Sequence, residues 1–240
     1  QNRAVVAKDF ERIILNENTN LSSVVAFGGE EAIPAVHGKV YIAIKPQGEL
    51  IPTATLKDEI KNSIKSRTML GIDPIIIDPT YLYVIPTITT YYDTLRANIG
   101  TSAIQALVRD SITNYSTNSL EQFGKKLRYS RFVRDLDNTN DAVLNNEAEF
   151  QMQKRFVPST TSATLVELEF HNAIEKNSIT STTFTFNNFI AQLDDDGLGN
   201  IRMFRFNTEK EQVFIDSKAG AIDYTTCLLY TSPSPRDRSS

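Results

Sequence analysis

The 240-residue sequence has no tryptophan, a single cysteine and only two histidines. One cysteine cannot form an internal disulfide, and it cannot build a zinc site that needs several thiolates. Neither His37 nor His171 stands in a catalytic motif with a serine or an acidic neighbour, and the patterns Gly-x-Ser-x-Gly, His-Glu-x-x-His and Ser-x-x-Lys are absent. The sequence therefore shows no sign of the hydrolases and metalloenzymes that short motifs identify.

Long apolar runs and basic clusters are missing as well. No apolar run approaches the ~20 residues of a transmembrane helix, and the N-terminus lacks the apolar segment of a signal peptide. The formal net charge is −4, whereas binding to a phosphate backbone needs clustered Lys and Arg. With 40% hydrophobic and 22% charged residues, the composition predicts a globular protein. We expect no nucleic acid, membrane, cofactor or small-molecule substrate as its partner.

The first structural feature that the sequence predicts is a β-hairpin. Residues 23–27 and 39–44 are rich in apolar and β-branched residues, and each segment is long enough for one sheet crossing. Residues 28–38 between them contain glycine and proline and are too long for a two-residue turn. We expect the two strands to form the centre of the first domain.

Helices and further strands surround this hairpin. An amphipathic pattern predicts a helix over residues 7–16, and a second helix with Thr55 as its N-cap follows the hairpin. Residues 74–79 and 80–92 have β composition, and Pro86 marks an edge strand or a bulge because it has no N–H to donate. This order predicts an α+β fold with a split-βαβ, ferredoxin-like, two-layer domain.

The middle of the chain is predicted to be helical. Thr101 or Ser102 can cap a helix with a clear apolar face, a second short helix follows from Ser119, and a third begins at Ser130. From Val143 the pattern becomes extended. Such short helices bury little surface alone, so we expect them to pack on a neighbouring element.

A Ser/Thr-rich connector at residues 158–162 precedes a β-rich module that ends incomplete. The segments that predict strands in this module are residues 164–170, 181–186, 200–206 and 213–215. The predicted domains are an α+β sheet domain over residues 1–95, a helical segment over 96–157 and the antiparallel β module over 158–226.

The last segment, residues 227–240, looks like a translated sequencing adapter, because a transposon-end sequence encodes the same peptide in one reading frame. We therefore expect a non-native tail there and exclude it from the fold prediction. The chain also starts at Gln1 rather than at methionine. The prediction is an internal, metagenomic fragment of a longer protein.

Three stretches invite a more specific interpretation, and the sequence disfavours each. Residues 28–31 resemble a phosphate-binding loop, but two glutamates follow the two glycines and would repel an anion. In residues 194–205 the spacing of a calcium loop places Leu198 and Arg205 where oxygen ligands are required, so a polar hairpin turn is favoured and cation binding stays open. Residues 38–44 provide only Tyr41 for stacking on RNA bases.

An ordered set of short motifs does resemble a known family, the baseplate wedge proteins of T-even-type contractile-tailed phages, which are the baseplate J-like component of the inner ring. The motifs lie at residues 2–5, 9–10, 28–30, 38–46, 78–81, 179–182 and 220–224. The family usually has threonine where Val6 stands and tyrosine where Phe10 stands. The threonine would cap the first helix, and its loss costs roughly 1 kcal/mol.

The resemblance implies a structural, non-enzymatic virion protein located in the tail baseplate and assembled in the cytoplasm of the host bacterium. Its implied partners are further copies of itself and other baseplate wedge proteins, joined as a homo-oligomeric ring around the tail hub that rearranges when the sheath contracts. Two alternatives stay open. One is a peripheral adhesin or receptor-binding protein, and the other is a cofactor-free hydrolase whose scattered carboxylates leave no motif.

No catalytic, cofactor-binding or metal-binding residue is predicted. Loops held by a rigid sheet commonly make contacts with partners. We therefore expect partner contacts from Gly29, Glu30, Glu31 and His37 in the loop between the hairpin strands.

Overall fold

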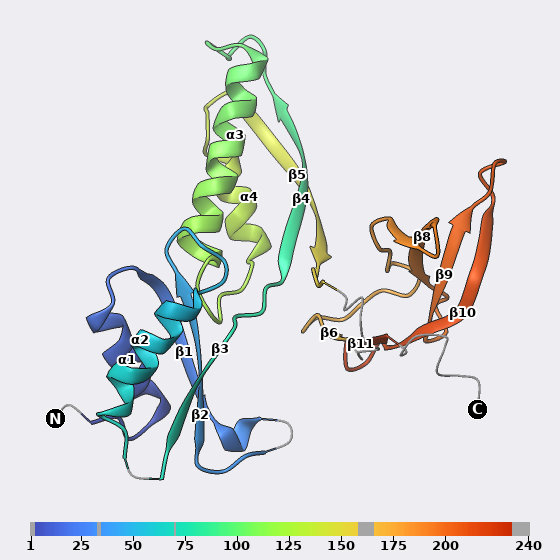
Figure 1. Cartoon of the computed structure of the whole chain (residues 1–240). Helices are drawn as coiled ribbons and strands as arrows, with labels where there is room; N and C mark the ends of the chain where they lie inside the picture. The colour runs from blue at the N-terminus through green and yellow to red at the C-terminus, as the bar shows by residue number, and fades with distance from the viewer. Residues whose placement is uncertain (1–2, 33–34, 70, 158–165, 232–240) are drawn as a thin grey trace. The chain divides into compact units, whose positions relative to one another are not determined.

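The structure is a computed structural model that describes residues 3–32, 35–69, 71–157 and 166–231. It divides into two compact units (Figure 1). The first unit comprises Gln1–Thr80 and Pro86–Phe150, and the second comprises Tyr81–Ile85 and Gln151–Ser240. Two hydrophobic clusters lie in the first unit and one in the second. In the described part of the chain, no helix has the length and apolar character needed to cross a membrane.

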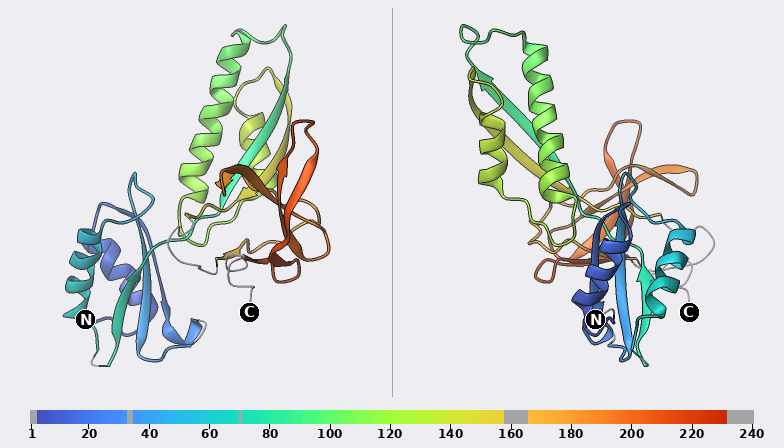
Figure 2. Two further views of the ribbon diagram at one scale, coloured as in Figure 1. Left: turned by 45° about the vertical axis from the view of Figure 1, so that its right-hand side comes forward. Right: turned by 90° about the vertical axis from the view of Figure 1, so that its left-hand side faces the viewer.

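The first of these clusters belongs to a two-layer arrangement that we call the α/β layer. It consists of helix α1 (Ala7–Glu17), strands β1 (Leu21–Gly28) and β2 (Lys39–Pro46), helix α2 (Ala54–Lys65) and strand β3 (Asp73–Ile77). The strand order is β1-β2-β3, with β1 and β2 antiparallel and β2 and β3 parallel. Both helices cover the same face of this sheet (Figure 2). The predicted hairpin and its two flanking helices are confirmed.

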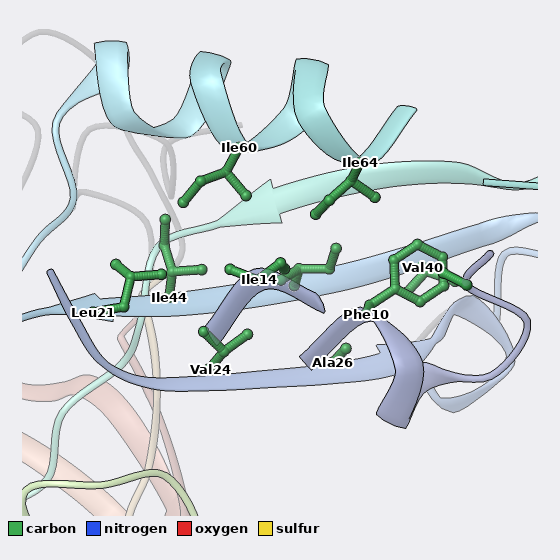
Figure 3. Packing of buried hydrophobic residues seen from close by; sticks show 11 residues of the cluster. Phe10, Ile14, Leu21, Val24, Ala26, Val40, Ile44, Ile60 and Ile64 are labelled. Carbon is green, nitrogen blue, oxygen red and sulfur yellow. The ribbon is translucent and has the colours of Figure 1, made fainter. Parts of the chain in front are cut away.

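The core of the α/β layer follows directly from sequence periodicity. Its largest fully buried side chains are Phe10, Ile14, Ile42, Ile44, Ile60 and Ile64, and all of these except Ile42 are labelled in Figure 3. Each helix contributes two residues four positions apart, which lie on one helix face, and β2 contributes two residues two positions apart, which lie on one strand face. The side chains of both helices therefore meet the same face of the sheet.

The two helices begin differently. The Thr53 Oγ1 accepts a hydrogen bond from the Leu56 N–H at 3.3 Å, so Thr53 caps α2. The predicted cap at Thr55 is wrong, because that residue lies inside the first turn. In α1 the N-cap position is held by Val6, which has no side-chain acceptor. The Asp9 carboxylate instead accepts the N–H groups of Val5 and Val6 at 3.0 and 3.2 Å, and these bonds lower the pKa of Asp9.

The predicted split-βαβ topology is wrong, although the α+β class is confirmed. A split unit needs another strand between its two parallel strands, whereas β2 and β3 pair with each other directly. The Asp73 N–H bonds to the Gly38 carbonyl at 2.8 Å, on the β2 side. Pro74 therefore faces the outer edge of the sheet, where it has no N–H to offer another strand. Strand β4 (Tyr83–Tyr92) accordingly does not join this sheet.

β4 instead forms a two-stranded ribbon with β5 (Val143–Gln153), on which helices α3 (Thr101–Tyr115) and α4 (Tyr129–Asp137) pack (Figure 1). Ile104 and Phe132 are buried in this second cluster. Both strands of a ribbon have a free edge, which explains why β4 tolerates Pro86. The extended pattern from Val143 and the helix around Ser130 are confirmed.

Two details of the helical segment differ from the prediction. Gly100 is the N-cap of α3, and the Thr101 hydroxyl lies 2.7 Å from the Tyr92 hydroxyl instead of capping the helix. The short helix predicted from Ser119 does not form, because a π-helical turn (Ser116–Leu120) leads into a loop. In that loop the Phe123 N–H donates to the Ser23 Oγ at 3.2 Å. This bond to β1 uses a backbone donor that a helix would need.

The second unit contains an antiparallel six-stranded sheet in the order β6-β11-β10-β9-β8-β7. Its strands are β6 (Glu167–Glu169), β7 (Phe184–Phe186), β8 (Phe189–Asp195), β9 (Asn200–Phe206), β10 (Gln212–Asp223) and β11 (Leu228–Thr231). Register shifts in β10 are β-bulges, which bend a strand and curl the sheet into a half-barrel. The predicted antiparallel β module is thus confirmed.

Strands β8 and β11 were not predicted. The sequence of residues 189–195 does not alternate between apolar and polar residues, because Phe189 and Ile190 are adjacent and both apolar. In the structure both of these side chains are exposed. The predicted connector at residues 158–162 lies outside the described residues. So does most of the segment predicted to be a non-native tail, but its first part forms β11, which pairs with both β10 and β6. The non-native origin of residues 227–240 and the predicted domain boundaries stay predictions.

Candidate functional site

The loop between β1 and β2 holds the residues predicted to contact partners. Residues Gly29–Glu31 form a short 3-10 helix, and the Gly29 carbonyl accepts N–H groups from Ala32 and Val36 at 3.2 and 2.8 Å. Gly29 is buried, and a Cβ at this position would collide with the Val36 carbonyl oxygen. Gly29 can therefore shape the loop but has no side chain with which to contact a partner.

The other predicted contact residues of this loop are positioned differently from Gly29. Glu30, Glu31 and His37 are all exposed, and within the described part of the chain none of them forms an ion pair. No group of three or more His, Cys, Asp or Glu side chains among the described residues has metal-binding geometry. Two exposed carboxylates on the 3-10 turn, with the exposed His37 imidazole later in the same loop, suit a contact surface.

The Asp194–Asn200 segment, the strongest cation candidate of the sequence, is the hairpin turn between β8 and β9, as favoured from its composition. Asp194 accepts a bidentate pair of hydrogen bonds from Arg202 at 3.0 and 2.8 Å. Asp196 accepts bonds from the Leu198 N–H and from both nitrogens of Asn200, chiefly the side-chain amide, which lower the pKa of Asp196 to about 2. These carboxylates point to different partners inside the protein.

Asp195, the third carboxylate, is buried and ties the turn to two other segments. It accepts the N–H groups of Asn177 and Ile179 at 2.6 and 2.8 Å and the Tyr224 hydroxyl at 2.5 Å. Burial, followed by the bond to Asp195, raises the pKa of Tyr224 to about 12. A buried carboxylate with three donors is stable without a cation. These bonds hold the β8–β9 turn to residues 177–179 and to Tyr224 at one end of the six-stranded sheet, so the cluster has a structural role.

The opposite end of β8 and β9 is open and apolar. A hollow of about 260 Å³ lies there, which we call the Arg205 hollow; it is lined by Phe186, Asn187, Phe189, Arg205, Val213, Phe214 and Ile215. The Arg205 guanidinium carbon lies 4.5 Å from the centre of the Phe189 ring. The sequence signal for this site was the uninterrupted apolar run at residues 213–215, which was interpreted only as a strand.

Comparisons with known proteins show which family the chain resembles. A family model described as baseplate structural protein gp6, C-terminal domain I, matches residues 6–77, and one described as C-terminal domain III of the same protein matches residues 80–155. The chain is also 25% identical over 209 residues to the baseplate wedge protein gp6 of Enterobacteria phage T4. The chain belongs to the gp6 family of phage baseplate structural proteins.

For this gp6-family chain, the family assignment confirms the resemblance found in the sequence and gives a location, the tail baseplate of the virion. The family is one of structural proteins, which agrees with the predicted non-enzymatic role. The alignment covers 85% of this chain but 31% of the T4 protein, so the chain spans about a third of that relative's length.

Two further residues considered for chemistry in the gp6-family chain have ordinary surroundings. The His171 Nδ1 lies 2.9 Å from a Glu169 carboxylate oxygen, and both side chains are well exposed. Tyr41 stacks on Phe27 of the neighbouring strand, with 5.5 Å between ring centres. The stack is a cross-strand pair of the kind that stabilises sheets, which gives Tyr41 a structural role.

Proposed function

We propose that this chain is the part of a gp6-like wedge protein that associates with other copies and with other wedge proteins, and so helps to form the baseplate ring around the tail hub. In this proposal the ring rearranges on host contact and thereby allows the sheath to contract. The α/β layer and the six-stranded sheet supply separate contact surfaces, and the helical segment links them.

The observation that carries the proposal is the combination of separate cores with uncovered apolar side chains. The three hydrophobic clusters share no residue. Yet Leu144 in β5, Tyr129 in α4, and Ile190 and Phe206 in the six-stranded sheet are more than half exposed. Contiguous exposed apolar surface is what marks protein–protein interfaces, and these residues are the candidates for it.

The loop residues Glu30, Glu31 and His37 are proposed as part of these contacts, with Gly29 as the residue that shapes the loop. Glu30 and Glu31 lie on the 3-10 turn, and within the described residues neither they nor His37 form an ion pair. Surface charges of this kind affect partner selection and the rate of association more than the final affinity.

The test uses the protein extended to its natural ends, together with the other wedge proteins of the same phage. Analytical ultracentrifugation should show self-association and complexes with wedge proteins. Reversing both loop charges, Glu30→Arg with Glu31→Arg, should slow complex formation, whereas Asp58→Arg with Glu59→Arg on the exposed side of α2 serves as the matched control. A protein that stays monomeric at high concentration and binds no wedge protein would disprove the proposed function.

A further inference from the structure

The end of the six-stranded sheet around the Arg205 hollow has more exposed apolar surface than its own fold requires. Exposed fractions are 48% for Phe189, 38% for Val213, 47% for Phe214 and 39% for Ile215. Three of these residues are consecutive in β10, where the register shift between Phe214 and Asp216 leaves Ile215 as an extra residue. A run of three exposed apolar residues opposes folding and solubility unless it has a function.

The size of the hollow indicates what it can hold. Pockets for small-molecule ligands measure roughly 300–1,000 Å³ and enclose most of the ligand. The Arg205 hollow measures about 260 Å³ and is open to solvent. It has room for one bulky side chain inserted from outside, as in the central contacts of protein interfaces, where such side chains fill pockets.

Arg205 defines the charge of the occupant. Its guanidinium lies over the Phe189 ring, and no carboxylate within the described residues pairs with it. Arg202, three residues earlier in β9, instead has the bidentate partner Asp194. A guanidinium covered by an apolar partner would lose water, so the covering segment must supply a carboxylate. Arginine beside aromatic rings is also the composition enriched at interface cores.

The walls of the hollow are rigid, which favours binding to a preformed surface. The Asn207 Oδ1 accepts the N–H groups of Glu209 and Glu211 at 3.0 and 2.8 Å and closes the tip of the β9–β10 hairpin. On the other side, Asn187 and Asn188 both have positive φ values, 47° and 66°, as the two-residue turn between β7 and β8 requires. Little ordering is therefore needed on binding.

We propose that the Arg205 hollow is a docking site for a segment of another baseplate protein in which a bulky apolar side chain stands close to an aspartate or glutamate. The apolar side chain fills the space between Phe189 and Val213, and the carboxylate pairs with Arg205. This inference rests on the proposed function, since it names one of the contact surfaces that the wedge protein would use. β7 is a three-residue edge strand, so the segment can enter without displacing another strand.

The experiment places a photo-cross-linking side chain in the full-length protein, Phe189→p-benzoylphenylalanine, and assembles it with the other wedge proteins of the same phage. Mass spectrometry of the irradiated complex should locate the cross-link in a different protein, next to a segment that holds a bulky apolar residue near a carboxylate. A cross-link to another copy of this chain, or none in the assembled complex, would overturn the inference.

Charge variants provide the second measurement. Arg205→Glu should weaken binding of the cross-linked partner by roughly tenfold or more, as central interface contacts do. Arg155→Glu is the matched control and should change binding less than about twofold, because Arg155 also lies over an aromatic ring, that of Tyr83, but outside the hollow. Reversing the partner's carboxylate to lysine should restore binding to Arg205→Glu.

Hydrogen exchange of each variant shows whether the six-stranded sheet remains folded. Arg205→Lys keeps the positive charge, so it tests whether the charge alone is enough for binding. Equal effects of Arg205→Glu and Arg155→Glu would refute the inference while leaving the proposed function intact. Failure of the unmodified protein to bind any wedge protein would instead refute the proposed function itself.

Discussion

The α/β layer and the six-stranded sheet differ in how many apolar residues they bury together. In the α/β layer, two helices cover one face of the sheet, and eleven buried residues form its cluster. In the six-stranded sheet the cluster contains three buried residues, Ile201, Ile222 and Leu229, and several large aromatic side chains remain exposed. The first region is stabilised by its own large core, whereas the second buries fewer apolar residues together and exposes Phe189, Phe206 and Phe214.

This difference shows how the two regions can serve one assembly. A region with a closed core can present polar loop residues such as Glu30 and Glu31 to partners without losing stability. A region with an open apolar end gains stability when a partner covers that end, because burial of apolar surface is the main favourable term in association. Substitutions in the two regions should therefore affect different measurements.

The largest expected effect is in the α/β core. Phe10 is fully buried between α1 and the sheet, so Phe10→Ala should lower the free energy of unfolding by about 3–5 kcal/mol. Hydrogen exchange should show the loss across α1, β1 and β2. Phe189→Ala removes the same ring from an exposed site and should lower stability by less than about 1 kcal/mol. Similar losses for both variants would contradict the contrast between the regions.

The α/β layer is also where sequence periodicity was most informative. Phe10 and Ile14, and Ile60 and Ile64, lie on single helix faces, so their burial follows from spacing alone. Periodicity could not decide which strands pair. The direct β2–β3 contact depends on the crossover helix, and the outward position of Pro74, which ends the sheet, depends on register. Neither the pairing of β2 with β3 nor the orientation of Pro74 can be predicted from a local sequence pattern.

The candidate sites were predictable to a different degree. Glu30, Glu31 and His37 were expected on an exposed loop and are exposed. The burial of Gly29 depends on the Val36 backbone folding back over it, which no local pattern indicates. The Arg205 hollow combines β7, β8, β9 and β10, and its apolar residues fit ordinary strand composition. Only their exposure marks them, and exposure is a tertiary property.

A smaller effect is expected at the closed end of the six-stranded sheet. Tyr224→Phe removes one of three donors to the buried Asp195 carboxylate and should cost about 1.5–3 kcal/mol, since hydrogen bonds to buried charges are strong. The pKa of Tyr224 is raised from 10.0 to about 12, so folding favours the protonated hydroxyl. Its contribution is complete below pH 10 and lost as the pH rises toward 12. Urea unfolding at pH 7 and pH 11.5 should show a larger loss of stability in the unmodified protein than in Tyr224→Phe, because other tyrosines and the lysines titrate in both.

A comparable change in the α/β layer should increase stability. Val6 occupies the N-cap of α1 without an acceptor, so Val6→Thr should stabilise this helix by about 1 kcal/mol. Thr53→Ala, which removes the existing cap of α2, is the matched variant and should destabilise by a similar amount. Hydrogen exchange in the first turn of each helix measures both effects. No gain for Val6→Thr would mean that the bond from the Asp9 N–H to the Val6 carbonyl, at 2.9 Å, already satisfies the helix end.

The smallest effect concerns Asp196 in the β8–β9 turn, at the end of the sheet opposite the Arg205 hollow. Hydrogen bonds from Asn200 and from the Leu198 N–H hold its pKa near 2, below the ordinary value of 3.8. The folded state therefore favours the carboxylate, and the contribution to stability is present above pH 3.8 and lost as the pH falls through about 2. Solvent access keeps this contribution small. Asp196→Asn should reduce protection of the turn more at pH 5 than at pH 2, and an Asp196 carboxyl that titrates near 3.8 by NMR would show that the turn is not held in this way.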